Sequence, residues 1–274
     1  MSRKGVKIAR ELRILRRMTA ANIAMNLVYR ANFAMFMVSN IAIPVISLLV
    51  WRAALASGAR LPVGKEYLTT YFVILSFVTM ATSSWMAPFL SEDIRLGKLS
   101  IWMIRPASML HESIANNLAE KALKAAMLIP MVGVMWLLFA DAVRVPGNGV
   151  RWLLFAVSTV LGAVLVFVLD VIIGALAFWL DDTSGINRAR TLILGLLSGA
   201  IVPLALMPHW SQGFMRMQPF RFTVSFPVEI LAGHLPAHDI AVGFGVQLGY
   251  VLAVCLLARR IWSAGLRSYS AVGA

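Results

Sequence analysis

Long apolar runs alternate with short polar segments along the whole chain, and six of the runs approach the length of a membrane span. They cover residues 31–51, 67–90, 118–140, 152–180, 191–206 and 240–257. A helix needs about 20 apolar residues to cross the hydrocarbon core of a bilayer. The pattern therefore predicts an all-α integral membrane protein with six transmembrane helices.

The first 28 residues follow a different pattern, because apolar and basic positions there share a helical period. One face carries Ile8, Leu12, Leu15, Thr19 and Ile23, and the opposite face carries basic residues at positions 7, 10, 13 and 17. A basic amphipathic helix of this kind lies flat in the headgroup region of a membrane. We expect residues 1–28 to form an interfacial elbow helix ahead of a transmembrane domain at 29–274. It either anchors the chain in lipid only or also touches a cytoplasmic partner.

The segment 207–239, between the last two runs, is predicted to form short re-entrant helices. It is apolar, yet Pro208, Pro219, Pro227 and Pro236 interrupt it. Such a segment is too apolar for a free loop and too broken for a full span. Non-helical backbone at membrane depth is tolerated only where protein buries it or where it lines a cavity. We therefore expect it to cap the outer end of a pathway.

Composition supports the membrane assignment and excludes several kinds of site. The chain of 274 residues is 60% hydrophobic and 14% charged, whereas soluble domains carry about 25% charged residues. The net charge of +13 does not indicate nucleic-acid binding, because no soluble basic domain is present. The single cysteine, Cys255, cannot form an internal disulfide, and no Cys/His cluster has the spacing of metal ligands.

The basic residues predict the orientation of the chain. With the N-terminus inside, the segments on the inner side collect 18 Lys and Arg residues and those on the outer side collect 7. Short cytoplasmic segments carry an excess of Lys and Arg. Both termini are therefore expected in the cytoplasm, and basic residues beside the spans are expected to meet anionic lipid.

A compact block of charge, "SEDIRLGKLSIWMIRP", separates the second and third apolar runs. We expect a short helix with Ser91 as N-cap and with Glu92 and Asp93 in its first turn, where the helix dipole favours acidic residues. Gly97 would end or kink it, and Arg105-Pro106 would stop the next segment. The block is either a solvated loop or a docking helix for a soluble protein.

Motifs of nucleotide binding and catalysis are missing from the chain. The sequence contains no G-x-x-x-x-G-K-[ST], no H-E-x-x-H and no G-x-S-x-G. The first of these cradles nucleotide phosphates in a P-loop. If the protein uses ATP, another chain binds the nucleotide.

Two further features lie inside the predicted spans. Asp170 is well inside the fourth, where a carboxylate is costly and marks a functional site, a pair with a neighbouring helix or a local water pocket. Gly195–Gly199 and Gly245–Gly249 have the G-x-x-x-G spacing. That spacing permits close packing of helices within one chain or between two subunits.

The charge block and one later segment resemble a known family. The sequences "SEDIRLGKLSIWMIRPASML" and "QPFRFTVSFPVEILAG" resemble those of ABC-2 type transporter permeases, in the uncharacterised branch related to the daunorubicin-type exporters. Both segments fall at the expected places in the topology. With the amphipathic start and the six spans, the resemblance covers nearly the whole chain.

The resemblance implies a non-catalytic permease subunit of an ATP-driven exporter in the bacterial inner membrane. Two ATPase subunits would bind ATP and Mg²⁺, and a second permease, identical or homologous, would complete the pathway. The coupling helix would cover residues 91–99, with the contacts made by Ser91, Glu92, Asp93, Ile94, Arg95, Gly97, Lys98 and Leu99. Lys98 departs from the family pattern, which has an acidic residue there. The extracellular gate would comprise Pro219, Phe220, Phe226, Pro227 and Gly233.

Two other classes of function remain open at this stage. An intramembrane enzyme would need polar residues that converge at one depth, and the spans offer little beyond Asp170. A secondary transporter would show several charges at the midplane or broken helices in matching halves. Neither class would require an ATPase partner.

Overall fold

The computed structural model describes residues 3–28, 30–105, 107–139, 142–233 and 235–269, and every regular element in these ranges is helical. The longer helices are α1 Arg3–Val28, α2 Arg30–Ala56, α3 Lys65–Thr82, α4 Met86–Arg95, α6 Met109–Phe139, α7 Gly149–Ala175, α8 Ser184–Leu197 and α11 Ala237–Ser268. The shorter ones are α5 Leu99–Met103, α9 His209–Met217 and α10 Ser225–Ala232, with 3-10 turns η1 Leu176–Phe178, η2 Leu204–Leu206 and η3 Pro219–Thr223.

Three helical segments of the described chain are long and apolar enough to cross a membrane. They cover 65–95, 149–178 and 237–268, and α2 adds a shorter apolar stretch at 42–56. An all-helical membrane fold is thereby confirmed. The count of six spans stays a prediction, and residue 140, where the predicted third span ends, lies outside the described residues.

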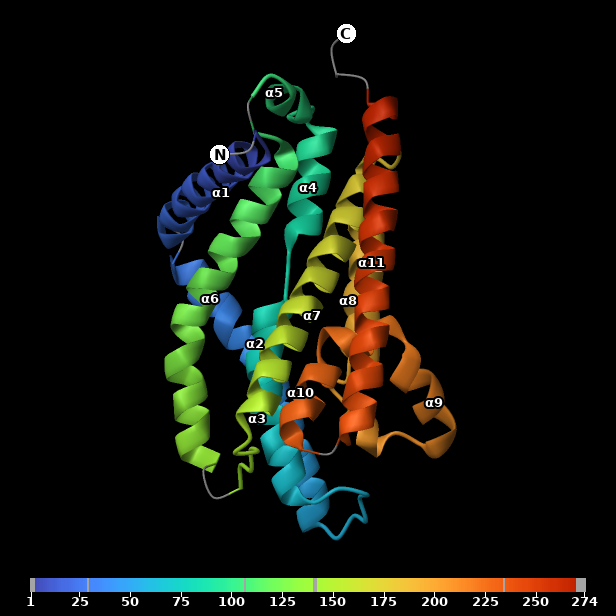
Figure 1. Cartoon of the computed structure of the whole chain (residues 1–274). Coiled ribbons are helices and arrows are strands. Elements are labelled where there is room, and N and C mark those ends of the chain that lie inside the picture. Colours follow the sequence, from blue (N-terminus) through green and yellow to red (C-terminus); the bar gives the residue numbers. More distant parts are fainter. Residues whose placement is uncertain (1–2, 29, 106, 140–141, 234, 270–274) are drawn as a thin grey trace.

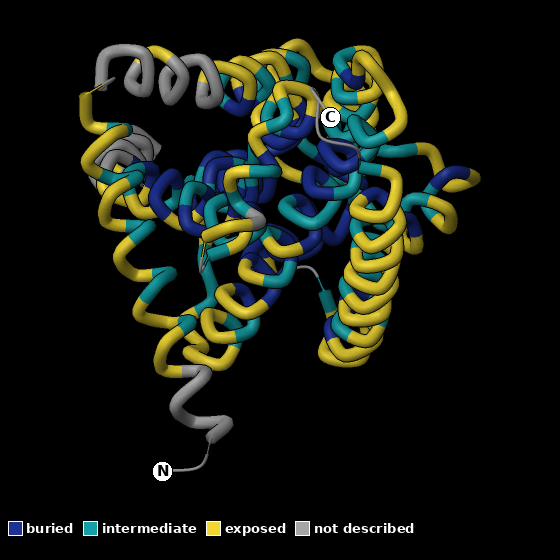
Figure 2. Tube along the Cα trace, turned by 90° about the horizontal axis from the view of Figure 1, so that it is seen from above, coloured by how far each residue is buried: buried dark blue, intermediate teal, exposed yellow. Residues whose placement is uncertain are grey.

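Helix α7 is the centre of the bundle, with α11, α4, α10 and α3 packed around it (Figure 1). The view along the bundle in Figure 2 shows the buried residues gathered in its middle. Tyr71, Phe72 and Phe226 are among the fully buried side chains of the largest apolar cluster. The carbonyl oxygen of Thr223 lies 2.9 Å from where a Cβ on Gly162 would be. This glycine therefore lets the backbone of η3 lie directly against α7.

The predicted N-terminal helix is present, and one of its sides faces protein. Helix α1 lies along the first half of α6 (Figure 1). Asn22 donates a hydrogen bond to Glu112 at 3.0 Å, and Glu11 lies 2.9 Å from the ring of His111. Leu12, predicted on the apolar face, is 61% exposed. Since α6 occupies one side, only the remaining surface of α1 is available to lipid or to a partner.

At two predicted spans the helices differ from the predicted apolar runs, because non-helical residues interrupt or shorten them. The second, 67–90, consists of α3 and α4 with a non-helical link at Ser83–Trp85. The fifth, 191–206, is replaced by the shorter α8, which begins at Ser184 and ends at Leu197. Gly199 has a φ of +83°, and a Cβ there would lie 2.7 Å from the Cβ of Ser225. Only glycine fits this turn, which stops the helix.

The start of α8 is fixed by a side chain that precedes it. The carboxylate of Asp182 accepts hydrogen bonds from the backbone N–H and the hydroxyl of Ser184, both at 2.8 Å. These bonds lower the pKa of Asp182, the backbone N–H having the larger effect. In the sequence, the signal for this helix start was therefore Asp182, which lies before the predicted apolar run at 191–206.

The predicted re-entrant segment contains two helices with very different environments. All eight residues of α10 are buried, whereas Trp210 of α9 is 87% exposed. Gly233, with a φ of +85°, ends α10 in the left-handed conformation that glycine adopts without strain. The segment therefore contains short helices, and their re-entry into a membrane stays a prediction.

Candidate functional site

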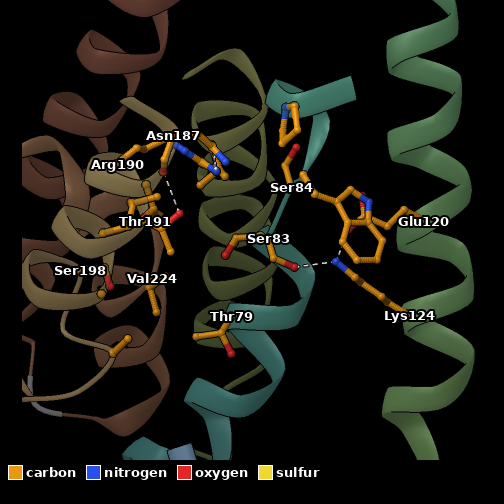
Figure 3. Close-up of a pocket in the computed structure, with 18 residues that line it drawn as sticks. Thr79, Ser83, Ser84, Glu120, Lys124, Asn187, Arg190, Thr191, Ser198 and Val224 are labelled. Atoms are coloured by element: carbon orange, nitrogen blue, oxygen red, sulfur yellow. Dashed lines mark hydrogen bonds and ion pairs between the residues drawn. The ribbon is translucent and has the colours of Figure 1, made fainter. Parts of the chain in front are cut away.

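A cavity of about 350 Å³ with many polar residues in its lining lies between α6 and α8, over the link that joins α3 to α4 (Figure 3). We call it the polar valley. Its polar lining residues come from four elements and include Thr79, Ser83, Ser84, Glu120, Lys124, Asn187, Arg190, Thr191 and Ser198. Such a concentration of hydroxyl and charged groups inside an apolar bundle makes this cavity a candidate functional site.

The floor of the valley is the non-helical link at Ser83–Trp85. Ser83 caps α3 by donating its N–H to the carbonyl oxygen of Thr79 at 2.9 Å. Its own carbonyl oxygen accepts a hydrogen bond from Lys121 at 3.0 Å, and its hydroxyl accepts one from Lys124 at 2.7 Å. Ser84 accepts a hydrogen bond from Asn117 at 3.3 Å. Side chains of α6 thus satisfy the broken stretch, as non-helical backbone in a membrane requires.

Asp170 is fully buried and is paired with a neighbouring helix. Nη1 of Arg190 lies 2.5 Å from its Oδ1. Its Oδ2 accepts hydrogen bonds from the hydroxyl of Ser84 at 2.9 Å and from the backbone N–H of Ala87 at 3.4 Å. Arg190 also donates to Asn187 at 3.2 Å. This one carboxylate therefore connects α7, α8 and the start of α4.

A second ion pair joins the valley on the side of α6. Lys124 contacts the carboxylate of Glu120 one turn away, and both side chains are 1% exposed. The ammonium of Lys124 also lies 4.9 Å from the centre of the Trp85 ring. Burying a charge is tolerable when it is paired and hydrogen-bonded. On the side of α6 the valley is thus lined by the Glu120–Lys124 pair, and on the side of α8 by Arg190, whose partner Asp170 is not a lining residue.

The predicted coupling helix differs from the prediction in two respects. Ser91 is not an N-cap, because α4 begins at Met86 and places Ser91 in its interior, buried, with its hydroxyl 2.8 Å from that of Thr183. Gly97, with a φ of +71°, separates α4 from α5. Residues 91–99 are therefore the end of one helix and the start of another.

Burial divides the residues predicted to make the coupling contacts. Ile94 and Leu99 are 3% exposed and pack with Leu90, Met109 and Val171. Glu92, Arg95 and Lys98 are exposed. Asp93 is half-buried and lies 2.7 Å from Lys98, whose pKa it raises through this hydrogen bond. The apolar Leu96 and Ile104, 59% and 86% exposed, flank these charges.

The residues predicted for the extracellular gate gather around a third buried ion pair. Arg221 of η3 donates to Glu229 of α10 at 2.6 Å. Phe226 is fully buried, and Pro227 is buried beside it. Pro219 begins η3 and Phe220 is half-buried. The predicted gate residues therefore form a packed segment, apart from the exposed Gly233.

Sequence reasoning missed most of the charged groups in the interior. Lys121, Lys124 and Arg190 count among the 18 residues assigned to the inner side, and Arg221 counts among the 7 on the outer side. Without these four residues, the inner segments still carry fifteen Lys and Arg residues and the outer segments six, so the asymmetry that predicts the orientation persists. The one local signal was Glu120 followed by Lys124, an acid and a base on one helix face in an apolar run.

Among the described residues, no group of three or more His, Cys, Asp or Glu side chains is placed to hold a metal ion. Neither a curated protein nor a solved structure shows a significant match to this sequence. A family model described as "ABC-2 family transporter protein" matches residues 65–273, which include the polar valley, the α4–α5 turn and the segment before α11. The chain belongs to the ABC-2 family of transporter proteins.

Proposed function

We propose that this chain is the permease subunit of an ATP-driven exporter and that the polar valley is its share of the translocation pathway. Two ATPase subunits bind ATP and Mg²⁺, and a second permease, identical or homologous, closes the pathway from the opposite side. The complex lies in a bacterial inner membrane, with both termini of the chain in the cytoplasm. The observation that carries this proposal is the valley itself, whose lining includes the buried Glu120–Lys124 pair and Arg190, the partner of the buried Asp170.

The position of α4 supports a mechanism of alternating access. Its C-terminal end forms the α4–α5 turn, and its N-terminal end adjoins the link at Ser83–Trp85 on the valley floor. Ser91 ties it to Thr183 just before α8, and the N–H of Ala87 bonds to Asp170 of α7. An ATPase that moves the turn would therefore move the valley floor, because a short helix transmits displacement as a rigid body.

The segment before α11 is suited to close the outer end of the pathway. It lies at the opposite end of the bundle from α5 (Figure 1). The Arg221–Glu229 pair and the buried Phe226 hold it in one packed arrangement. In the proposed cycle this segment stays packed in the resting state and separates from its counterpart on the second permease when substrate leaves.

Copurification tests the proposal. A tagged permease, expressed with its ATPase, should retain the ATPase in detergent, and the complex should hydrolyse ATP. Thr191→Trp places a large ring in the valley, whereas Leu192→Trp changes the neighbouring residue, which is 68% exposed and does not line it. Only Thr191→Trp should block transport while ATPase binding persists. Failure to recover any ATPase, or equal transport by both variants, would contradict the assignment.

One observation favours an intramembrane hydrolase as a second candidate. Lys124 lies 2.7 Å from the hydroxyl of Ser83, the spacing of a nucleophile and its base. The contact with Glu120 argues against this role, because the amine of Lys124 is already paired with a carboxylate. A serine-directed fluorophosphonate should leave the protein unlabelled, and labelling that Ser83→Ala removes would favour the hydrolase.

A further inference from the structure

A second cavity, of about 730 Å³, forms an apolar groove between α6 and α7. Its walls are built by side chains such as Phe77, Leu118, Leu128, Phe155, Val160 and Phe167. The volume falls within the range of roughly 300–1,000 Å³ found for pockets that bind small molecules. Because the groove belongs to a membrane domain, the molecules that reach it come from the lipid phase.

Two lysines separate this apolar groove from the polar valley. Lys124 lines both cavities, and Lys121 lines the groove alone. Both ammonium groups donate to Ser83, one to its hydroxyl at 2.7 Å and the other to its carbonyl oxygen at 3.0 Å. A polar boundary therefore runs along one wall of a groove whose other walls are hydrocarbon.

The charges at this boundary do not balance. Glu120 pairs with Lys124, and Asp170 pairs with Arg190. Lys121 is the third cation of this cluster. Its ammonium donates a hydrogen bond to the carbonyl oxygen of Ser83, and among the described residues it forms no ion pair with a carboxylate. An ammonium carries three N–H donors. The two carboxylates thus leave one positive charge beside the groove, where a neighbouring anion is favoured because the surroundings have a low dielectric constant.

We propose that the apolar groove binds a single-chain anionic amphiphile from the membrane, with its anionic group against Lys121 and its chain between α6 and α7. The charge selects the ligand, because a chain that leaves the lipid for the groove exchanges one hydrocarbon environment for another. The site does not depend on the proposed transport function. An anion bound at Lys121 would lie next to Ser83, on the floor of the polar valley.

Two photoactivatable probes with the same chain test the proposal. Hexadecanoic acid and hexadecanol, each with a diazirine in the chain, are added to the full-length protein in lipid nanodiscs, and labelled peptides are mapped. The acid should label α6 and α7 about tenfold more than the alcohol, the contribution expected of a hydrogen bond to a charged group. Lys121→Met should remove this difference, and Lys121→Arg should retain it.

Two tryptophan variants separate the groove from the rest of the lipid-facing surface. Ala156→Trp fills the groove and should abolish labelling by the acid, whereas Val157→Trp, at the next residue and outside the groove, should leave it unchanged. Equal labelling by acid and alcohol, or an excess that survives Lys121→Met, would overturn the proposal. Displacement of the acid by millimolar inorganic phosphate would show a site for free anions instead, and cross-links from the groove to a second protein chain would show a protein interface.

Discussion

Arg190 and Asp170 bind α8 to α7 inside the bundle, with Nη1 of the arginine 2.5 Å from Oδ1 of the aspartate. The aspartate is fully buried and the arginine side chain is 12% exposed. The residue that the sequence marked as either functional or paired is thus paired. Its partner belongs to the wall of the polar valley, so the pair fixes the position of that wall.

Removal of this carboxylate should destabilise the protein. Asp170→Asn leaves Arg190 buried without its counter-charge, which costs about 3–5 kcal/mol. A thermal melt in detergent should show a clear fall in the midpoint. Arg190→Gln combined with Asp170→Asn should cost less than the sum of the single changes, because neither charge is then left alone.

Asp181→Asn is the matched control, since Asp181 is an exposed acid just before α8. Its effect should stay within about 0.5 kcal/mol, as at most surface positions. If Asp170→Asn melts at the temperature of the unmodified protein, the pair does not hold the bundle together.

Two glycines of α11 should respond to alanine in opposite ways. A Cβ on Gly243 would lie 2.2 Å from Cε2 of Phe226, whereas a Cβ on Gly245 would have nothing within 4 Å. Gly245→Ala should raise stability by roughly 0.5–1 kcal/mol through helix propensity. Gly243→Ala should lower it by about 1–3 kcal/mol through overpacking. Phe226→Leu added to Gly243→Ala should relieve part of this loss, and thermal melts of the three single variants and this double variant measure it.

Local patterns were sufficient for the elements that depend on neighbouring residues. The helical period of the first residues predicted α1 over 1–28, and it spans Arg3–Val28. Gly97 was predicted to end or kink its helix and does so with a positive φ. Each of these features is encoded within a few positions, so it could be found without knowledge of the tertiary fold.

The break at Ser83–Trp85 had a local signal that the hydropathy pattern concealed. Pro88 lies in the first turn of α4, where proline lacks an N–H and its ring would clash with the carbonyl of Ser84 in a continuous helix. The apolar run continues across this point, so hydropathy alone predicts one unbroken span. The start of α4 is thus determined by the backbone restrictions of Pro88, which a hydropathy profile does not detect.

Apart from the local Glu120–Lys124 pair, the valley could not be predicted, because its other contacts join distant parts of the chain. Asp170 meets Arg190 from another helix, and Lys124 meets Ser83 across the bundle. Single-sequence periodicity indicates which face of a helix is apolar, but not which helices become neighbours. From the sequence alone, Lys121, Lys124 and Arg190 were therefore assigned to cytoplasmic segments, whereas the structure places them inside the bundle.

The orientation of the chain predicts the accessibility of single cysteines. Gly147 and His209 are exposed, and the α6–α7 connection that holds Gly147 lies at the opposite end of the bundle from α5 (Figure 1). In a Cys255→Ser background, Gly147→Cys and His209→Cys should react with an impermeant maleimide in intact cells. Lys98→Cys should react only after permeabilisation. Protection of both Gly147→Cys and His209→Cys from the reagent in intact cells would contradict the predicted topology.

The α4–α5 turn should be the surface that an ATPase contacts, and burial determines which residues test this. Leu99 cannot be an anchor, because it is 3% exposed within the bundle. The accessible candidates are Arg95 with the apolar Leu96 and Ile104, which are 59% and 86% exposed. Truncation of residues at the centre of an interface costs about 2 kcal/mol or more, which is a loss of roughly thirtyfold in affinity.

The triple variant Arg95→Ala, Leu96→Ala and Ile104→Ala should reach the membrane, melt near the normal temperature and lose its ATPase on purification. Leu99→Ala supplies the contrast. It should lower the melting temperature, since truncation of a buried leucine costs about 2–5 kcal/mol, yet its folded fraction should retain the ATPase. A solvated loop would give the reverse for the triple variant, with the ATPase retained and ATP hydrolysis unchanged, because exposed side chains without a partner contribute little. The ATPase recovered per folded permease therefore decides between a docking surface and a loop.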